Sequence, residues 1–113
     1  MLGFGTPGGP RRKRPQKTGM LSVGILTLEI HLPYSHSLKE KRMVLRKLKD
    51  RLRGKFNVSV AEVDHQDLWQ RGALAVAAIS SSEVSLRQVL EGVRVESEHV
   101  LGGDLIDSTI EIL

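Results

Sequence analysis

The chain has no cysteine among its 113 residues, few aromatic side chains and no long apolar run. Without cysteine it forms neither a disulfide nor a thiolate metal site, and this composition is typical of a reducing cytoplasm. No apolar stretch approaches the roughly 20 residues that cross a bilayer as a helix. We therefore predict a cytoplasmic protein without a membrane-spanning segment.

Basic residues are concentrated in two segments of the chain. Residues 1–19 carry five basic and no acidic side chains, and residues 39–55 carry nine basic and two acidic ones. The other residues include eleven acids and only three bases. Charge separated in this way indicates association with a charged partner. Because residues 1–19 are also rich in glycine and proline, we predict a disordered basic tail followed by one domain over residues 20–113.

The apolar pattern of this domain predicts four strands and two helices. The expected strands cover 22–32, 56–64, 72–79 and 104–113, and the expected helices cover 38–53 and 81–99. Ser37 with Glu40 forms a capping box before the first helix, and Gly54 is its predicted stop signal. Ser80 with Glu83 repeats the capping box before the second helix. The order β-α-β-β-α-β predicts a ferredoxin-like α+β fold, with a four-stranded antiparallel sheet and two helices on one face.

Periodicity also predicts which side chains form the core. A sector of about 120° on the first helix is apolar at 100° per residue, and the second helix and the last strand have apolar faces of their own. The predicted core residues of these elements are Leu38, Val44, Leu45, Leu48, Leu52, Leu86, Val89, Leu90, Val93, Ile106, Ile110 and Ile112.

Three strings of the sequence carry a family resemblance. They are VGILTLEIHLP at 23–33, SHSLKEKR at 35–42 and FNVSVAEVDHQDLWQR at 56–71. With them the chain resembles the YlxP-like family of small bacterial proteins over residues 20–113, and residues 1–19 have no counterpart in the family pattern. The resemblance implies a ferredoxin-like fold and no known catalytic residues. Family members tend to be encoded beside translation and ribosome-maturation genes, which implies a ribosomal or RNA-related role by association.

The first helix carries a row of basic side chains beside its apolar sector. Five of them recur at steps of three, four, three and four residues and fall within about 80° of the helical circumference. They are Lys39, Arg42, Arg46, Lys49 and Arg53, which we call the basic row. Such a row can follow a phosphate backbone, and arginine adds bidentate contacts. The competing interpretation is a solvated face made of good helix formers.

Lys41 points in the same direction as Leu48 and Leu52, on the apolar side of the first helix. The favoured interpretation is that its ammonium group reaches solvent along the aliphatic stem. The alternatives are an ion pair with Glu29 or Asp107, or an anion shared with the helix N-terminus.

The sequence predicts neither a metal nor a cofactor nor a catalytic site. His31, His36 and His65 do not combine with acids at metal-ligand spacing. Ser37 and its neighbours are explained by helix capping, so no nucleophile–base pair remains. Trp69 lies in the predicted connection 65–71, where it either caps the core, the favoured interpretation, or projects as an anchor for a partner.

The scarcity of aromatic residues also limits how the chain could bind RNA. RNA-recognition domains of ferredoxin-like topology stack bases on aromatic residues of the open sheet face. Here the outward positions are predicted to be Thr27, Glu29 and His31, beside a strand rich in alanine. We therefore predict a non-enzymatic, RNA- or ribosome-associated accessory protein that docks through the basic row, with little sequence preference.

The alternative prediction is a homo-oligomeric interaction module. In that case a second copy covers the open sheet face, and the apolar contacts come from Val23, Ile25, Leu105 and Leu113.

Overall fold

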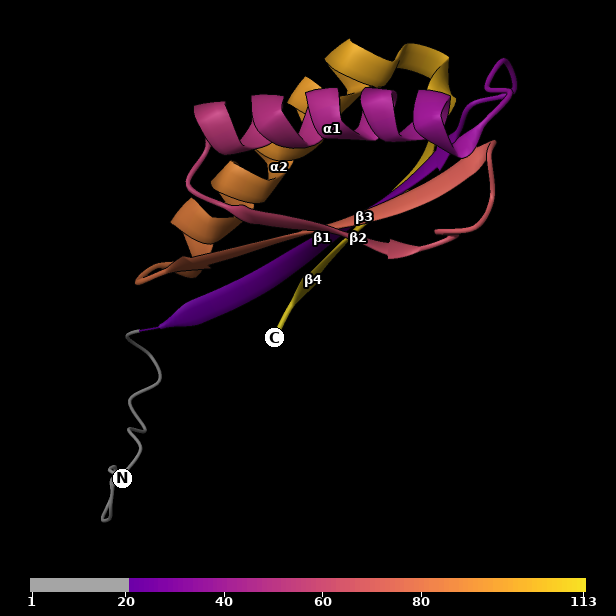
Figure 1. The fold of residues 1–113 in the computed structure, drawn as a ribbon. Coiled ribbons are helices and arrows are strands. Elements are labelled where there is room, and N and C mark those ends of the chain that lie inside the picture. Colours follow the sequence, from indigo (N-terminus) through magenta and orange to yellow (C-terminus); the bar gives the residue numbers. More distant parts are fainter. Residues whose placement is uncertain (1–20) are drawn as a thin grey trace, which may run out of the picture.

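The computed structural model describes residues 21–113, so the predicted tail over residues 1–19 lies outside the described residues. The elements are β1 (Ser22–His31), α1 (Leu38–Lys55), β2 (Ser59–Asp64), β3 (Arg71–Ser80), α2 (Glu83–Leu101), the short 3-10 helix η3 (Gly102–Asp104) and β4 (Leu105–Ile112). Both helices pack on the same side of a twisted sheet, and within residues 21–113 no helix covers its other side (Figure 1).

The strands form one sheet in the order β2-β3-β1-β4, and every neighbouring pair is antiparallel. This order arises because each β-α-β unit crosses over one intervening strand, and right-handed crossovers place both helices on one face. The predicted ferredoxin-like fold is confirmed. β2 and β4 are therefore the two edge strands, each with one side of its backbone unpaired within the sheet.

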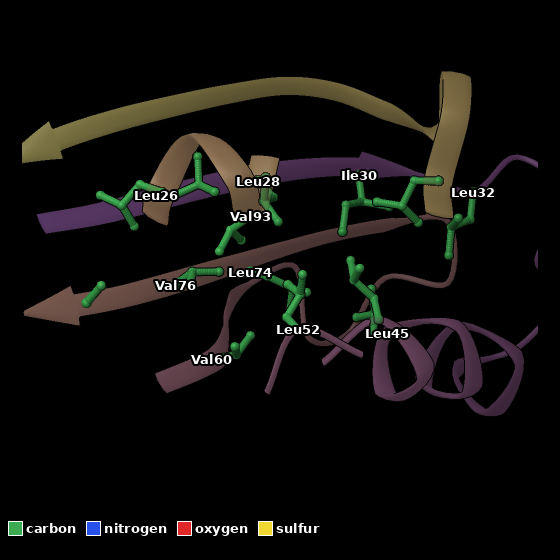
Figure 2. Packing of buried hydrophobic residues seen from close by; sticks show 14 of the residues in the cluster. Leu26, Leu28, Ile30, Leu32, Leu45, Leu52, Val60, Leu74, Val76 and Val93 are labelled. Carbon is green, nitrogen blue, oxygen red and sulfur yellow. The ribbon is translucent and has the colours of Figure 1, made fainter. Parts of the chain in front are cut away.

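The core fills the space between the sheet and the two helices (Figure 2). Alternate residues of β1 point into it, and Leu26, Leu28 and Ile30 are fully buried. α1 and α2 contribute leucines at helical spacing. The predicted helical core is confirmed, with Leu45, Leu48, Leu52, Leu86, Leu90 and Val93 buried and Leu38, Val44 and Val89 partly buried.

The prediction for β4 was wrong at its first residues. The pairing between β1 and β4 shifts register between Glu29 and Ile30, which marks a β-bulge. Because one extra residue reverses the alternation of side chains, Leu105 packs against the core and Ile106 is 52% exposed. Leu105 therefore does not lie on the open face, and Ile106 is not a core residue.

The structure also corrects the predicted end of α1 and the predicted start of β2. Gly54 does not end α1, which continues to Lys55. Phe56 is the C-cap, with its backbone N–H donating to the Leu52 carbonyl at 2.9 Å. Phe56 is partly buried against the core, so β2 begins only at Ser59 rather than at residue 56.

The N-terminus of α2 is capped by a different serine from the predicted one. Ser82 is the N-cap, and its hydroxyl accepts a hydrogen bond from the Ser85 N–H at 3.2 Å. Ser80 instead accepts from the Ser82 N–H at 3.1 Å, which fixes the turn that leads into the cap. The predicted Ser80–Glu83 capping box is therefore wrong by two residues.

Candidate nucleic-acid interface

The basic row lies on the surface of α1. Lys39, Arg42, Arg46 and Arg53 are exposed, and Lys49 is half-buried. Within residues 21–113, no ion pair or side-chain hydrogen bond is formed by Lys39, Arg42, Arg46 or Lys49. Four cationic groups in one row are thus left for solvent or for a partner.

The row faces the open edge of the sheet. Arg53 Nη2 donates a hydrogen bond of 2.8 Å to the carbonyl oxygen of Val60, which belongs to the edge strand β2. This contact places the row's side of the helix above that edge. It also withdraws part of the Arg53 guanidinium from other partners.

The opposite flank of α1 is neutralised by α2. Arg51 Nε and Lys55 Nζ lie 2.7 and 2.8 Å from the two carboxylate oxygens of the buried residue Glu96. The hydrogen bond from Lys55 holds the pKa of Glu96 below its usual value, against the opposing effect of burial. Glu96 of α2 thus compensates part of the charge of this flank, whereas four residues of the basic row have no such partner within residues 21–113.

The first turn of α1 is capped as predicted. The Ser37 hydroxyl accepts from the Glu40 N–H at 3.1 Å. Glu40 in turn reaches back to the N–H of His36 at 2.6 Å, one residue before the cap. These bonds occupy the acidic side chain of the first turn and fix the direction in which Lys39 and Arg42 leave the helix.

Lys41 does not reach solvent, so the favoured interpretation of this residue was wrong. It is fully buried at 0% exposure, and its ammonium group lies 3.1 Å from Glu62 Oε2. It also donates to the carbonyl oxygens of His65 at 2.7 Å and Arg71 at 3.1 Å, with Gln66 farther away at 3.4 Å. The alternative of a specific ion pair is confirmed, with Glu62 as the partner in place of Glu29 or Asp107.

The sequence contained a signal for this partner that the prediction missed. Glu62 lies two residues after the buried Val60 on β2, so both side chains face the helices. An acid on the core side of an edge strand requires a buried or half-buried cation. Lys41 was the single base in the apolar sector of α1.

The contacts of Lys41 hold the connection between β2 and β3. This connection, residues 65–70, is the β2–β3 loop. His65 begins it with a positive φ of 61°, which is uncommon for a residue other than glycine. Its ring lies 3.3 Å from Glu29 Oε1, and its carbonyl accepts from both Lys41 and the Leu68 N–H. At the far end, Gln70 Nε2 donates to the carbonyls of Pro33 and Ser35.

Trp69 does not cap the core. It is 53% exposed, and Leu68 beside it is also exposed. Residues Asp67 to Arg71 line a pocket of about 550 Å³ at this loop. The favoured interpretation of Trp69 was therefore wrong, and the indole is presented on the surface.

The open face of the sheet has the residues that the sequence predicted. Thr27 pairs with Ala75 and Glu29 with Ala73, and no aromatic side chain belongs to these positions. Glu29 forms an ion pair with Arg71, whose Nη2 lies 3.1 Å from Glu29 Oε1. Within residues 21–113 no group of three or more His, Asp or Glu side chains is arranged to hold a metal ion.

Neither α1 nor α2, the long helices of the described part of the chain, combines the length and apolar character that a transmembrane segment needs.

The chain is similar in sequence and in structure to known proteins. The chain is 42% identical over 71 residues to "Uncharacterized protein YlxP" of Bacillus subtilis (strain 168), a match that covers 63% of this chain and 77% of that protein. Among solved structures it is similar to the de novo designed protein Foldit4, with 11% identity, a TM-score of 0.48 and 82% and 93% of the two chains covered. It is also similar to SnoaB, a cofactor-independent oxygenase from Streptomyces nogalater, with 9% identity, a TM-score of 0.45 and 83% and 91% covered.

The two structural similarities are too weak to bear on function. Residues 23–109 match the family described as "Protein of unknown function (DUF503)". Because this match covers most of the chain, the protein belongs to the DUF503 family.

Proposed function

We propose that this protein is a non-enzymatic, cytoplasmic accessory protein that binds RNA, alone or in the ribosome, through the basic row of α1. The observation that carries the proposal is the row itself: five cationic side chains on one helical face, four of them without an ion pair or side-chain hydrogen bond within residues 21–113. Unpaired like charges repel one another, and a polyanion relieves that repulsion.

The geometry of the row favours a phosphate backbone over a diffuse acidic surface. From Lys39 to Arg53 the row extends for fourteen residue steps, or about 21 Å along the helix. Arginine offers bidentate hydrogen bonds that match phosphate oxygens, and lysine offers a point charge. The two acids of α1, Glu40 and Asp50, are outnumbered by the row, and Glu40 is bound to the His36 N–H, so the field of this face stays positive.

The same geometry implies weak sequence preference. Contacts from a helix face to phosphates position the protein and read no bases. The sheet face opposite the helices has alanine and threonine at the positions where stacking domains carry aromatic residues. Recognition through the row therefore depends on RNA shape and charge.

The test is a pair of charge-matched variants of the full chain. Arg42→Ala/Arg46→Ala removes two residues of the row, and Arg87→Ala/Arg94→Ala removes two charges from α2. Binding to a fluorescein-labelled RNA hairpin is measured by anisotropy across a range of salt concentrations. Because each phosphate contact contributes about 0.7–0.9 to the log–log salt slope, the α1 variant should lower the slope by about 1.4–1.8.

The α2 variant is the control and should leave the slope unchanged. The basic segment over residues 1–19 is present in every protein of this series, so its own contribution cancels in the comparison. Equal slopes for the two variants would remove the basic row from the interface. Absence of RNA binding by the unmodified chain at about 50 mM salt, where the electrostatic contribution is strong, would refute the proposal.

One observation supports a second candidate function, a homo-oligomeric interaction module. At one end of the open sheet face Ile79 is 63% exposed and Leu113 is exposed, and Val23 pairs with Ile79 across the strands. A second copy could cover these apolar side chains. Sedimentation equilibrium of the unmodified chain and of Ile79→Asp tests this candidate, which requires an oligomer that the substitution dissociates.

A further inference from the structure

The β2–β3 loop lies at the N-terminal end of α1, where the basic row begins with Lys39. β2 runs antiparallel to α1, so the loop that follows β2 returns to the first turn of the helix. The buried Lys41 joins the two directly, through hydrogen bonds to the His65 and Arg71 carbonyls on either side of the loop. Figure 1 shows this loop at the same end of the molecule as the start of α1. A polyanion that follows the row toward Lys39 would therefore extend toward the end of the molecule that carries this loop.

The loop is held in one conformation before any ligand binds. Its first residue is fixed by Lys41 and by the ring contact to Glu29, and its last residue by two hydrogen bonds from Gln70. A hydrogen bond of 3.0 Å from the Leu68 N–H to the His65 carbonyl closes a turn between them. Because the ordering of a loop opposes binding, a loop that is already ordered presents its side chains at lower entropic cost.

Trp69 exposes a large apolar side chain on this ordered loop. The indole is half exposed although burying it would stabilise the fold by the hydrophobic effect. It lines a pocket of about 550 Å³ together with Asp67 and Arg71. The hollow is shallow and open to solvent, and consecutive residues 67–71 line it. The pocket combines one aromatic surface with a carboxylate and a guanidinium.

We propose that the pocket of the β2–β3 loop binds one unpaired RNA base, stacked on Trp69, while the adjoining backbone lies on the basic row. An indole stacks on any base, and the Asp67 carboxylate can accept a hydrogen bond from an amino group on the base edge. The inference rests on the proposed function and adds the class of RNA: a strand with an unpaired nucleotide, such as a loop, bulge or end. In a continuous duplex the bases are stacked on one another and are not available to this pocket.

The position of the pocket distinguishes this protein from stacking domains that use the sheet. The open sheet face lies on the opposite side from α1, and its central positions are small or charged. Trp69 instead lies on the loop between β2 and β3, outside the paired positions of the sheet. A base is favoured over an apolar protein segment as the occupant, because the loop lies at the end of α1 where the basic row begins and a phosphate backbone on the row would carry its bases toward the loop.

The experiment uses Trp69 as its own reporter, because it is the single tryptophan of the chain. The full protein is titrated with two labelled RNAs of equal length, a single strand and a blunt duplex. Stacking should quench the indole emission with the single strand and leave it nearly unchanged with the duplex. Trp69→Ala should weaken single-strand binding about 5- to 150-fold. Its salt slope should equal that of the unmodified chain, because no phosphate contact is lost.

Trp69→Phe is the matched control, since phenylalanine retains a stacking surface and should retain most of the affinity. The emission measurement needs no substitution, so it stands even if a variant folds poorly. Salt-dependent binding of both RNAs without quenching would overturn the base pocket, leave the basic row intact and favour a protein partner for Trp69. Equal weakening of single strand and duplex by Trp69→Ala would overturn it as well. Absence of binding to either RNA would refute both this inference and the proposed function.

Discussion

Replacement of Lys41 by methionine should test the central tertiary contact of this fold. Methionine retains most of the aliphatic stem but removes the ammonium group, which lies within 3.1 Å of two backbone carbonyls and of Glu62 Oε2. Removal of one partner from a buried ion pair costs about 3–5 kcal/mol. Because the Glu62 side chain is 20% exposed, its carboxylate keeps some hydration, and we expect about 3 kcal/mol. For a domain of this size that corresponds to a Tm lower by about 12–24 °C.

Equilibrium unfolding in urea, followed by circular dichroism, measures the loss in the free energy of unfolding. Lys47→Met is the control, since Lys47 is exposed on the same helix and its replacement should change stability by less than about 0.5 kcal/mol. Glu62→Gln should cost less than Lys41→Met, because both carbonyl acceptors keep their donor. A loss below about 1 kcal/mol for Lys41→Met would refute the reasoning and show that the buried ammonium does not hold the β2–β3 loop.

Two further predictions concern glycine positions and acid stability. Gly54→Ala should stabilise the fold by about 0.5–1 kcal/mol in urea unfolding, since Gly54 lies inside α1 with open space around it. Gly24→Ala should destabilise it by about 1–3 kcal/mol, because a Cβ there would lie 2.8 Å from Leu90 Cδ1; a stabilising Gly24→Ala or a destabilising Gly54→Ala would contradict the packing. Since the pKa of Glu96 is lowered on folding, its stabilisation is complete above its ordinary value of 4.5 and is lost as pH falls through the lower folded value. Glu96→Gln should therefore lose less Tm than the unmodified chain between neutral pH and about pH 3, and an equal loss would refute this.

Local patterns in the sequence were enough for most of the fold. The alternation in β1 and the helical spacing of Leu45, Leu48 and Leu52 predicted which faces are buried, because a side chain's direction follows from strand and helix geometry alone. The exposed placement of the basic row followed from the same periodicity. The predictions failed where one extra residue reversed the alternation of side chains along a strand, as in β4 opposite Glu29 and Ile30.

The candidate site was less accessible to sequence reasoning, for a physical reason. The periodicity placed Lys41 on the apolar side of α1, but its acceptors are separated from it by 24 and 30 residues. Glu62 and the His65 carbonyl become its partners only because antiparallel pairing brings β2 back to the start of α1. Whether Trp69 is buried depends on the conformation of a loop that is fixed by these remote contacts. Residue types and their periodicity therefore determined the faces of the elements. Tertiary contacts decided that Arg51 and Lys55 on one flank of α1 pair with Glu96, and that the buried Lys41 holds the β2–β3 loop at the first turn of the helix.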